Sequence, residues 1–280
     1  MPIARVSTVV TSLLVAAACG GKPSAPPAGP TPAAAPPVNE RGGRVFDQWR
    51  RDPGAREVAL DKAPHDWRLK NLYGWDLRGA AGVYGPKYQA KPYVLARDWL
   101  AGTETVEQIV AILKDGDPDG GQPPFGPVLD DAALTAVATF IVDVRDGRLA
   151  RPDWIWTLSE GTPGNYVLNP GADPARGAAL FAERCSGCHG DDGTEIAIDD
   201  GEFTLGTHAR QKAYEDWIKI LNGQPGTEMG RQVVGPDGRA MAQEILDLLA
   251  ALCDRTKFPR GAATGDDVAD GDPRCGAYLR

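Results

Sequence analysis

The pentad Cys185-Ser186-Gly187-Cys188-His189 decides how the rest of the chain is interpreted. C-x-x-C-H is the signature of covalent haem attachment, because two thiols add to the porphyrin vinyl groups and the neighbouring imidazole ligates the iron. A redox C-x-x-C, or half of a zinc site, would use the same two cysteines. No second C-x-x-C completes a four-sulfur site in this sequence. We therefore expect one covalent haem c, attached at Cys185 and Cys188, with His189 as the proximal iron ligand.

Composition and charge narrow the possible partners. The 280 residues are 42% hydrophobic and 24% charged, which suits a soluble protein with a packed core. The net charge of −8 is unevenly distributed, since residues 151–280 carry 21 acidic and 13 basic side chains. Binding of nucleic acid requires a basic surface that displaces phosphate counterions, so we expect no nucleic-acid partner. An acidic surface suits a basic protein partner instead.

The N-terminus has the pattern of an export signal. Arg5 precedes an apolar run over residues 9–18, which is too short to span a bilayer. The run ends in Ala-Ala-Ala-Cys19 and resembles the lipobox of bacterial lipoproteins, although Ala16 stands where Leu is commonest. A secretory signal cut after an A-x-A site is the alternative. We expect a signal peptide over residues 1–18 and lipidation of Cys19, which would anchor the protein to a membrane in the bacterial periplasm.

Residues 19–39 form the next segment and are rich in proline and alanine. Such a composition cannot build a core and gives a semi-extended chain. We interpret this segment as a disordered tether that holds the globular part away from the membrane surface.

Residues 40–150 are predicted to be helical. One helix has Thr103 as its N-cap and ends at Gly116, with apolar residues at helical spacing between them. A second helix begins near Asp130, whose charge suits the positive end of the helix dipole, and runs to Gly147.

Residues 173–280 follow a similar plan. Asp173 is placed to cap a helix that has proline at its first position and runs into the pentad. Apolar stripes over residues 214–221 and 241–252 predict two more helices. The intervening residues 151–172, rich in Trp, Pro and Gly, are interpreted as an inter-domain connection. No strand-like alternation is sustained, so we predict a mainly α fold.

The two helical parts can be aligned with each other. Residues 185–193 fall on residues 69–77, and residues 217–223 fall on residues 109–115. The second part resembles the cytochrome c family over residues 173–253, and C-x-x-C-H is the most specific motif of that family. The first part resembles the same family, notably in two short stretches: Asp76-Leu77-Arg78-Gly79 and Pro123-Pro124-Phe125-Gly126-Pro127.

The first part departs from the family at every haem-binding position. Its counterpart of the pentad reads Leu-Lys-Asn-Leu-Tyr over residues 69–73, and Gln122 stands where the family places a methionine. The resemblance therefore implies two cytochrome c-like helical domains in tandem, the first without haem; an unrelated helical domain is the alternative. A haem-less copy must fill the cofactor volume with side chains. Aromatic residues between positions 67 and 99 supply that bulk: Trp67, Tyr73, Trp75, Tyr84, Tyr88, Tyr93 and Trp99.

The resemblance also implies a second iron ligand, usually a methionine sulfur. Met229 lies in a loop after an amphipathic helix, where the family presents this ligand, although Gly230 replaces the proline that often follows. Met241 falls on the apolar stripe of the last helix and is interpreted as a core residue. His208, which we expect in a surface or loop position, and an open sixth position are the alternatives to Met229.

Two cysteines remain, Cys253 and Cys275. An exported protein meets an oxidising compartment, where this pair would form a disulfide that holds residues 254–275 to the helix ending near Cys253. Two free thiols are the alternative.

The function expected from the sequence is electron transfer by a periplasmic, membrane-anchored c-type cytochrome with one haem and no catalytic residue. Its partners would be redox proteins, either a membrane oxidoreductase or another cytochrome. The alternatives are a haem enzyme or a gas or redox sensor with an open or displaceable sixth ligand, and an accessory haem subunit of a respiratory complex. The sequence shows no distal His/Arg arrangement for peroxide cleavage. By analogy, the haem-less domain would be a docking or spacing module.

Overall fold

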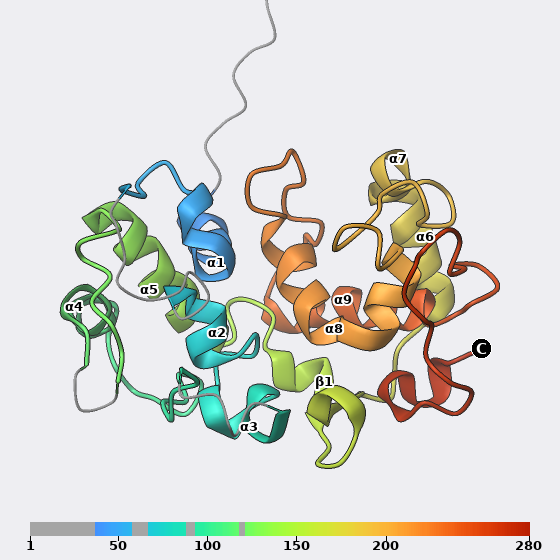
Figure 1. Cartoon of the computed structure of the whole chain (residues 1–280), viewed down its shortest axis with the longest axis horizontal. Coiled ribbons are helices and arrows are strands. Elements are labelled where there is room, and N and C mark those ends of the chain that lie inside the picture. Colours follow the sequence, from blue (N-terminus) through green and yellow to red (C-terminus); the bar gives the residue numbers. More distant parts are fainter. Residues whose placement is uncertain (1–36, 58–66, 88–92, 118–120) are drawn as a thin grey trace, which may run out of the picture. The chain divides into compact units, whose positions relative to one another are not determined.

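The computed structural model of the protein describes residues 37–57, 67–87, 93–117 and 121–280 (Figure 1). The predicted signal peptide, Cys19 and most of the predicted tether lie outside these residues. The fold class is mainly α, as the sequence predicts. Within the described ranges, no helix combines the length and apolar character needed to cross a membrane.

The first half of the described chain, up to residue 150, is built on two long helices that pack against each other. A Cβ atom on Gly42 of α1 would lie 1.9 Å from the carbonyl oxygen of Ala136 in α5, so glycine permits this close approach. One turn further along α1, the ring of Phe46 packs on Phe140 at a centroid distance of 5.9 Å. The helices of this half are α1 (Val38–Gln48), α2 (Leu69–Tyr73), α3 (Tyr84–Lys87), α4 (Val106–Asp115) and α5 (Asp131–Arg145), with 3-10 turns at Trp49–Arg51 and Gly79–Ala81.

The second half, residues 173–280, repeats this helix pair. A Cβ atom on Gly177 of α6 would lie 1.9 Å from the carbonyl oxygen of Asp247 in α9, and Phe181 is buried one turn later. Figure 1 shows α6 beside α9, as it shows α1 beside α5. The helices of this half are α6 (Pro174–Arg184), α7 (Ser186–His189), α8 (Leu205–Asn222) and α9 (Gly238–Leu252), followed by a 3-10 turn at Pro273–Tyr278.

The elements of the two halves correspond in order, with α1, α2, α4 and α5 matching α6, α7, α8 and α9. The glycines that end the matching short helices, Gly74 and Gly190, have φ of 69° and 77°. Those that end α4 and α8, Gly116 and Gly223, have φ of 81° and 80°. Each stands in the left-handed region that favours glycine at a helix C-terminus.

The helix starts agree with the sequence at two places and differ at a third. The Asp173 side chain caps α6 by accepting backbone N–H bonds, as predicted, and α5 begins at Asp131, where the sequence indicates, with the Asp130 side chain accepting the N–H of Ala133. The N-cap of α4 is Thr105, so the expectation of Thr103 is wrong. Thr105 and Gln108 form a reciprocal capping box, which requires a Glu or Gln three residues after the cap. Thr103 has no such residue at that spacing.

The connection between the halves, residues 151–172, contains an antiparallel pair of strands that the sequence did not predict. β1 (Trp156–Leu158) pairs with β2 (Tyr166–Leu168) in the register Trp156 to Leu168. Strands of three residues are too short to establish a period-two pattern. A tryptophan of this connection packs onto the second half: Trp156 is buried against Trp217 of α8, with ring centroids 5.9 Å apart.

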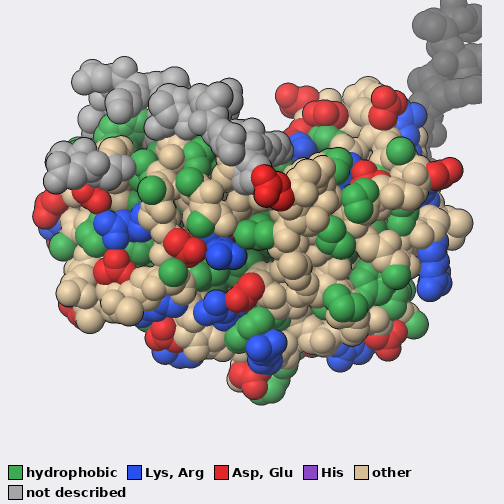
Figure 2. All heavy atoms as spheres, turned by 90° about the horizontal axis from the view of Figure 1, so that it is seen from below, with side chains coloured by type: hydrophobic (Ala, Val, Ile, Leu, Met, Phe, Trp, Pro, Cys, Tyr) green, Lys and Arg blue, Asp and Glu red, His purple; other side chains and the backbone are tan. Residues whose placement is uncertain are grey.

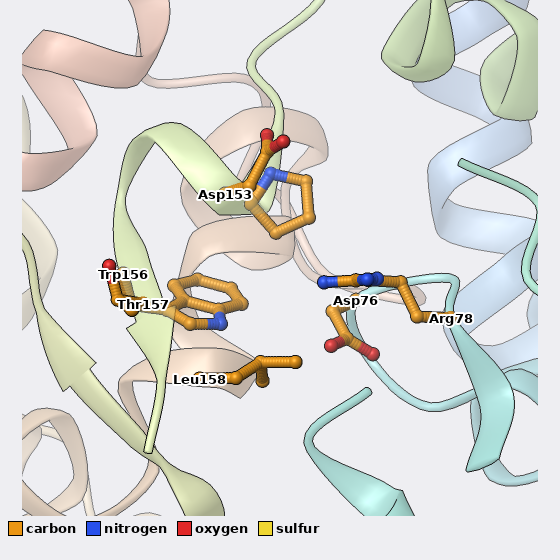
Figure 3. A pocket seen from close by; sticks show the side chains of 7 residues that line it. Asp76, Arg78, Asp153, Trp156, Thr157 and Leu158 are labelled. Carbon is orange, nitrogen blue, oxygen red and sulfur yellow. The ribbon is translucent and has the colours of Figure 1, made fainter. Parts of the chain in front are cut away.

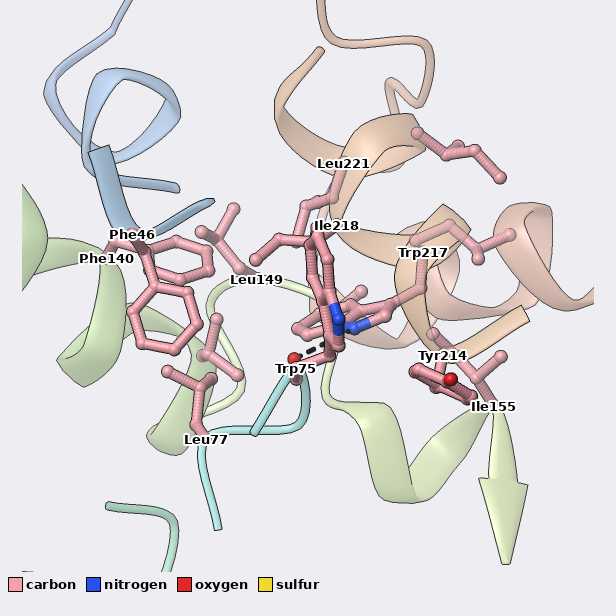
Figure 4. Close-up of a cluster of buried hydrophobic side chains, with 14 of the residues drawn as sticks. Phe46, Trp75, Leu77, Phe140, Leu149, Ile155, Tyr214, Trp217, Ile218 and Leu221 are labelled. Atoms are coloured by element: carbon pink, nitrogen blue, oxygen red, sulfur yellow. Dashed lines mark hydrogen bonds between the residues drawn. The ribbon is translucent and has the colours of Figure 1, made fainter. Parts of the chain in front are cut away.

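One hydrophobic core joins the two halves (Figure 4). Trp217 is fully buried and donates its indole N–H to the carbonyl oxygen of Trp75, 3.1 Å away. A buried ion cluster lies nearby, in which Asp47 of α1 accepts hydrogen bonds from Lys70 of α2 and Lys219 of α8. Residues 36–280 therefore form one compact unit.

Candidate functional site

The pentad forms a single turn at the end of α6. The backbone N–H of Cys185 donates to the carbonyl of Phe181, which continues α6, and the carbonyl of Cys185 accepts from the N–H of His189 at 3.0 Å. Gly190, with φ of 77°, ends the turn. One turn of backbone therefore carries both thiols and the imidazole.

The two thiols lack the environment of a redox or zinc-binding pair. Cys185 and Cys188 are the free cysteines of the described residues, the first half-buried and the second exposed. Burial raises the pKa of the Cys185 thiol to about 11, whereas reactive or zinc-ligating cysteines are thiolates near neutral pH. The described ranges also contain no group of three or more His, Cys, Asp and Glu side chains arranged to hold a metal ion. The raised pKa of the Cys185 thiol favours the haem interpretation of the pentad over a redox or zinc-binding pair.

His189 is in the form that ligates iron. Burial lowers the pKa of His189, which keeps the imidazole neutral at physiological pH. Its Nδ1 atom is buried and has no hydrogen-bond partner among the described residues. Two unpaired thiols, a neutral imidazole and an orphaned ring nitrogen on one turn are a donor set that fits haem c.

Met229 lies in a structured loop. This segment, the Met229 loop (residues 223–237), connects α8 to α9. The N–H of Met229 donates to the Thr227 hydroxyl at 3.2 Å, and its carbonyl accepts from the N–H of Gln224 at 3.1 Å. The Met229 side chain is half-buried, whereas Met241 packs against the core from α9.

Arg184, the residue before the pentad, joins it to the Met229 loop. Its guanidinium donates to the carbonyl of Gln232 at 3.1 Å and to the carboxylate of Glu244 at 2.9 Å. The N–H of Val234 donates to the same carboxylate at 3.2 Å. Val234 is also one of the few exposed large hydrophobic side chains of the described residues, together with Ile196, which follows the pentad.

The expectation that His208 lies at the surface or in a loop is wrong. His208 is buried near the start of α8, because the helix begins at Leu205, earlier than its apolar stripe indicates. Its Nδ1 lies 2.8 Å from a carboxylate oxygen of Asp216. Burial opposes protonation of His208, but the charge and hydrogen bond of Asp216 outweigh it and raise the pKa of the imidazole. Periodicity alone did not reveal this pair, since α8 departs from helical geometry at Lys212, between the two residues.

Buried side chains occupy the matching positions of the first half. Leu69, Leu72 and Tyr73 are at most 1% exposed. The Tyr73 hydroxyl donates to the side-chain carbonyl of Gln122, and the amide of Gln122 donates to the carbonyl of Ile112 at 2.7 Å. Of the aromatic residues expected to fill this half, Tyr73, Trp75, Tyr84 and Trp99 are buried, Trp67 and Tyr93 are partly buried, and Tyr88 lies outside the described residues.

Cys253 and Cys275 form a disulfide in the structure, and both are buried. The bridge holds the C-terminal tail to the end of α9. The buried guanidinium of Arg210 supports the same tail, since it pairs with Asp267 at 2.7 Å and donates to the carbonyl of Phe258 at 3.0 Å. We assign this region to folding stability.

A pocket of about 260 Å³ lies where the first half meets the inter-domain connection (Figure 3). Asp76, Arg78, Asp153 and Trp156 are among its lining residues, and none of the predicted site residues lines it. One carboxylate oxygen of Asp76 accepts from the N–H of Val83 at 2.9 Å, and the other has no partner within the part of the chain that the structure describes. On the face shown in Figure 2, acidic and basic side chains are interspersed with hydrophobic ones, so this face presents no patch of a single charge.

Comparison with known families places the pentad in a defined domain. Residues 174–250 match the cytochrome c family. This segment runs from the start of α6 into α9 and includes the pentad, α8 and Met229. The second half thus contains a cytochrome c domain, which implies covalent haem c and a haem-binding redox protein.

The other comparisons add little. None of the curated proteins matches the sequence. Among solved structures, a reducing HAO-like protein complex of Kuenenia stuttgartiensis is 15% identical, with a TM-score of 0.21, over 69% of this chain and 98% of that chain. Thiosulfate dehydrogenase from Marichromatium purpuratum, in its as-isolated form, is 22% identical, with a TM-score of 0.24, over 85% of this chain and 57% of that chain. Scores this low support no argument about fold or activity.

Proposed function

We propose that this protein transfers single electrons through one haem c, attached at Cys185 and Cys188 and ligated by His189. The observation that carries the proposal is the turn of α7, which presents both thiols and a neutral imidazole within the segment that matches cytochrome c. A bound haem c supplies a one-electron iron couple. The pentad holds the group covalently, and α6, which packs on α9, fixes the pentad.

Met229 is the proposed second iron ligand. Its loop is ordered by Thr227 and Gln224 and is joined to the pentad through Arg184. A thioether ligand favours Fe(II) and raises the reduction potential. His208 is the weaker candidate, because its Nδ1 is engaged by Asp216.

The first half is proposed to be a haem-less copy of the same domain. The matching helix order and the close helix contacts at Gly42 and Gly177 support this relationship. Trp217 and Trp75 belong to one core that both halves share. This favours a role of the first half as a scaffold for the haem domain over the docking or spacing role expected by analogy.

The proposed location is the bacterial periplasm, with lipidated Cys19 as a membrane anchor and residues 19–39 as the tether. The N-terminal sequence supports this proposal. The proposed partners are redox proteins, either a membrane oxidoreductase or another cytochrome.

The test is to produce the full chain with haem attachment in a periplasm and to measure its mass, haem content, ligation and potential. We expect one haem per chain and its loss in Cys185→Ser/Cys188→Ser, whereas the matched control Cys253→Ser/Cys275→Ser keeps the haem. A wild-type protein without covalent haem would contradict the proposal. Rapid stoichiometric binding of carbon monoxide by the reduced protein would favour a haem enzyme or sensor instead.

A further inference from the structure

We infer that the first half positions the Met229 loop through Arg44 of α1 and so strengthens the bond between Met229 and iron. The inference rests on the proposed ligation by Met229. Arg44 lies 185 residues before Met229 in the sequence and belongs to the half without a haem motif. It would be a positioning residue, since it acts through the backbone of the loop.

One guanidinium fastens both ends of the segment that leads to Met229. The Nε atom of Arg44 donates to the carbonyl of Asn222, the last residue of α8, at 2.7 Å. Its Nη2 atom donates to the carbonyl of Met229 at 3.0 Å. The same Nη2 lies 3.2 Å from the carboxylate of Glu40, a buried residue. A planar group with several donors suits this arrangement better than a flexible ammonium.

Two glycines allow the guanidinium to reach the loop. A Cβ atom on Gly43 of α1 would lie 2.2 Å from Cγ of Asn222, so α1 approaches the end of α8 closely because this position has no side chain. A Cβ atom on Gly223 would lie 2.0 Å from the carbonyl oxygen of Met229 and 2.7 Å from Nη2 of Arg44. Glycine at these two positions, one in each half, therefore permits the close approach through which Arg44 reaches the carbonyl oxygens of Asn222 and Met229.

A second tie between α1 and the loop lies on the other side of Met229. Arg231 donates from Nε to the carbonyl of Leu221 at 2.8 Å and from Nη2 to the side-chain oxygen of Asn39 at 3.1 Å. The loop is thus attached to α1 both at Met229 and two residues later.

The mobility of the Met229 loop affects how strongly Met229 binds iron. A loop that is free to move loses conformational entropy when its methionine binds iron, and this loss opposes the bond. Fastening both ends of the segment to α1 removes part of that cost before the bond forms. Without Arg44, we expect weaker ligation, a lower reduction potential and a more accessible sixth position.

The test uses the full haem-loaded chain with Arg44→Met and Arg44→Lys. The matched control is Arg41→Met, on the same helix, because Arg41 pairs with Asp52 of its own half at 2.7 Å. For Arg44→Met we expect a weaker methionine–iron absorption band, a lower potential and carbon monoxide binding faster by about tenfold. Arg44→Lys should fall between it and wild type, and Arg41→Met should equal wild type.

Hydrogen exchange provides a readout that does not depend on iron. The N–H of Gln224 donates to the carbonyl of Met229, so its exchange should accelerate in Arg44→Met and not in Arg41→Met. If Arg44→Met does not fold, the same comparison with Arg44→Lys decides. If the wild type shows the methionine–iron band but the Arg44 and Arg41 variants do not differ in these measurements, the role of Arg44 is overturned and the ligation by Met229 stands. A wild-type protein without the methionine–iron band overturns both the ligation by Met229 and the inference.

Discussion

The hydroxyl of Tyr73 donates a hydrogen bond to the side-chain carbonyl of Gln122, and both side chains are buried. In the aligned halves these positions correspond to His189 and Met229, the proposed iron ligands. Burial raises the pKa of Tyr73, which keeps the hydroxyl protonated as the donor. Two groups in direct contact leave no room for a porphyrin between them. If the first half is the haem-less copy proposed above, a hydrogen-bonded pair stands where the ligand pair would be.

Removing this hydrogen bond should destabilise the fold and leave the haem content unchanged. Tyr73→Phe leaves the carbonyl oxygen of Gln122 buried without its donor, which costs about 1–3 kcal/mol of unfolding free energy. Urea unfolding of the variant and the wild type measures the difference. An unchanged stability, or a loss of haem in Tyr73→Phe, would contradict the assignment of this pair to the haem-less half.

The local signals in the sequence predicted much of the fold. The helices beginning near Asp130 and after Asp173 start where predicted, because helix starts depend on neighbouring residues. The pentad likewise indicates its chemistry within five residues. The start of the first half was harder to locate, since α1 begins at Val38, inside the predicted tether, and its apolar pattern is broken by Gly42 and Gly43.

Contacts between distant residues were not predictable in the same way. The bonds from Arg44 to Asn222 and Met229 span well over a hundred residues, and no periodicity or motif indicates them. The burial of His208 depends on Asp216 across a break in α8. The sequence therefore predicted the candidate ligands of the site. It did not predict the contacts through which the first half holds the Met229 loop.

Asp76 should make stability depend on pH. Its carboxyl is fully buried, and burial raises its pKa from 3.8 to about 7. Between these values the folded protein keeps a proton that the unfolded chain loses, so this contribution is greatest below the unfolded pKa and is lost as the pH rises toward 7. Asp76→Asn stays neutral. From about pH 4 to about pH 8, its unfolding free energy should gain up to about 4 kcal/mol relative to wild type.

Urea unfolding of both proteins across this pH range tests the effect. Subtracting the two curves removes the titration of all other groups, provided that those groups are unchanged by the substitution. A difference that stays constant with pH would show that folding does not raise the pKa of Asp76.

The disulfide should contribute to stability and not to haem binding. Cys253 and Cys275 are separated by 22 residues, and a cross-link closing a loop of this size stabilises by about 3 kcal/mol in the chain-entropy model. Cys253→Ser/Cys275→Ser should lower the unfolding free energy by that amount, and a reductant should have no further effect on it. Its absorption spectrum should equal that of the wild type. A changed spectrum would place the tail in contact with the haem site.

The close helix contacts offer a test of whether the two halves fold together. Gly42→Ala and Gly177→Ala each place a Cβ atom 1.9 Å from a backbone carbonyl oxygen of the partner helix, and overpacking of this kind costs about 1–3 kcal/mol. Because Trp217 and Trp75 connect the halves through one core, we expect a single unfolding transition in every variant.

Fluorescence, which reports the tryptophans, and haem absorbance, which reports the pentad, should follow that transition together. Gly42→Ala, which lies in the first half, should therefore lower the midpoint seen by haem absorbance as much as Gly177→Ala does. If Gly42→Ala shifted only the fluorescence transition, the halves would be independent domains. The first half would then unfold independently of the second, and its contacts with the Met229 loop would not stabilise the haem domain against unfolding.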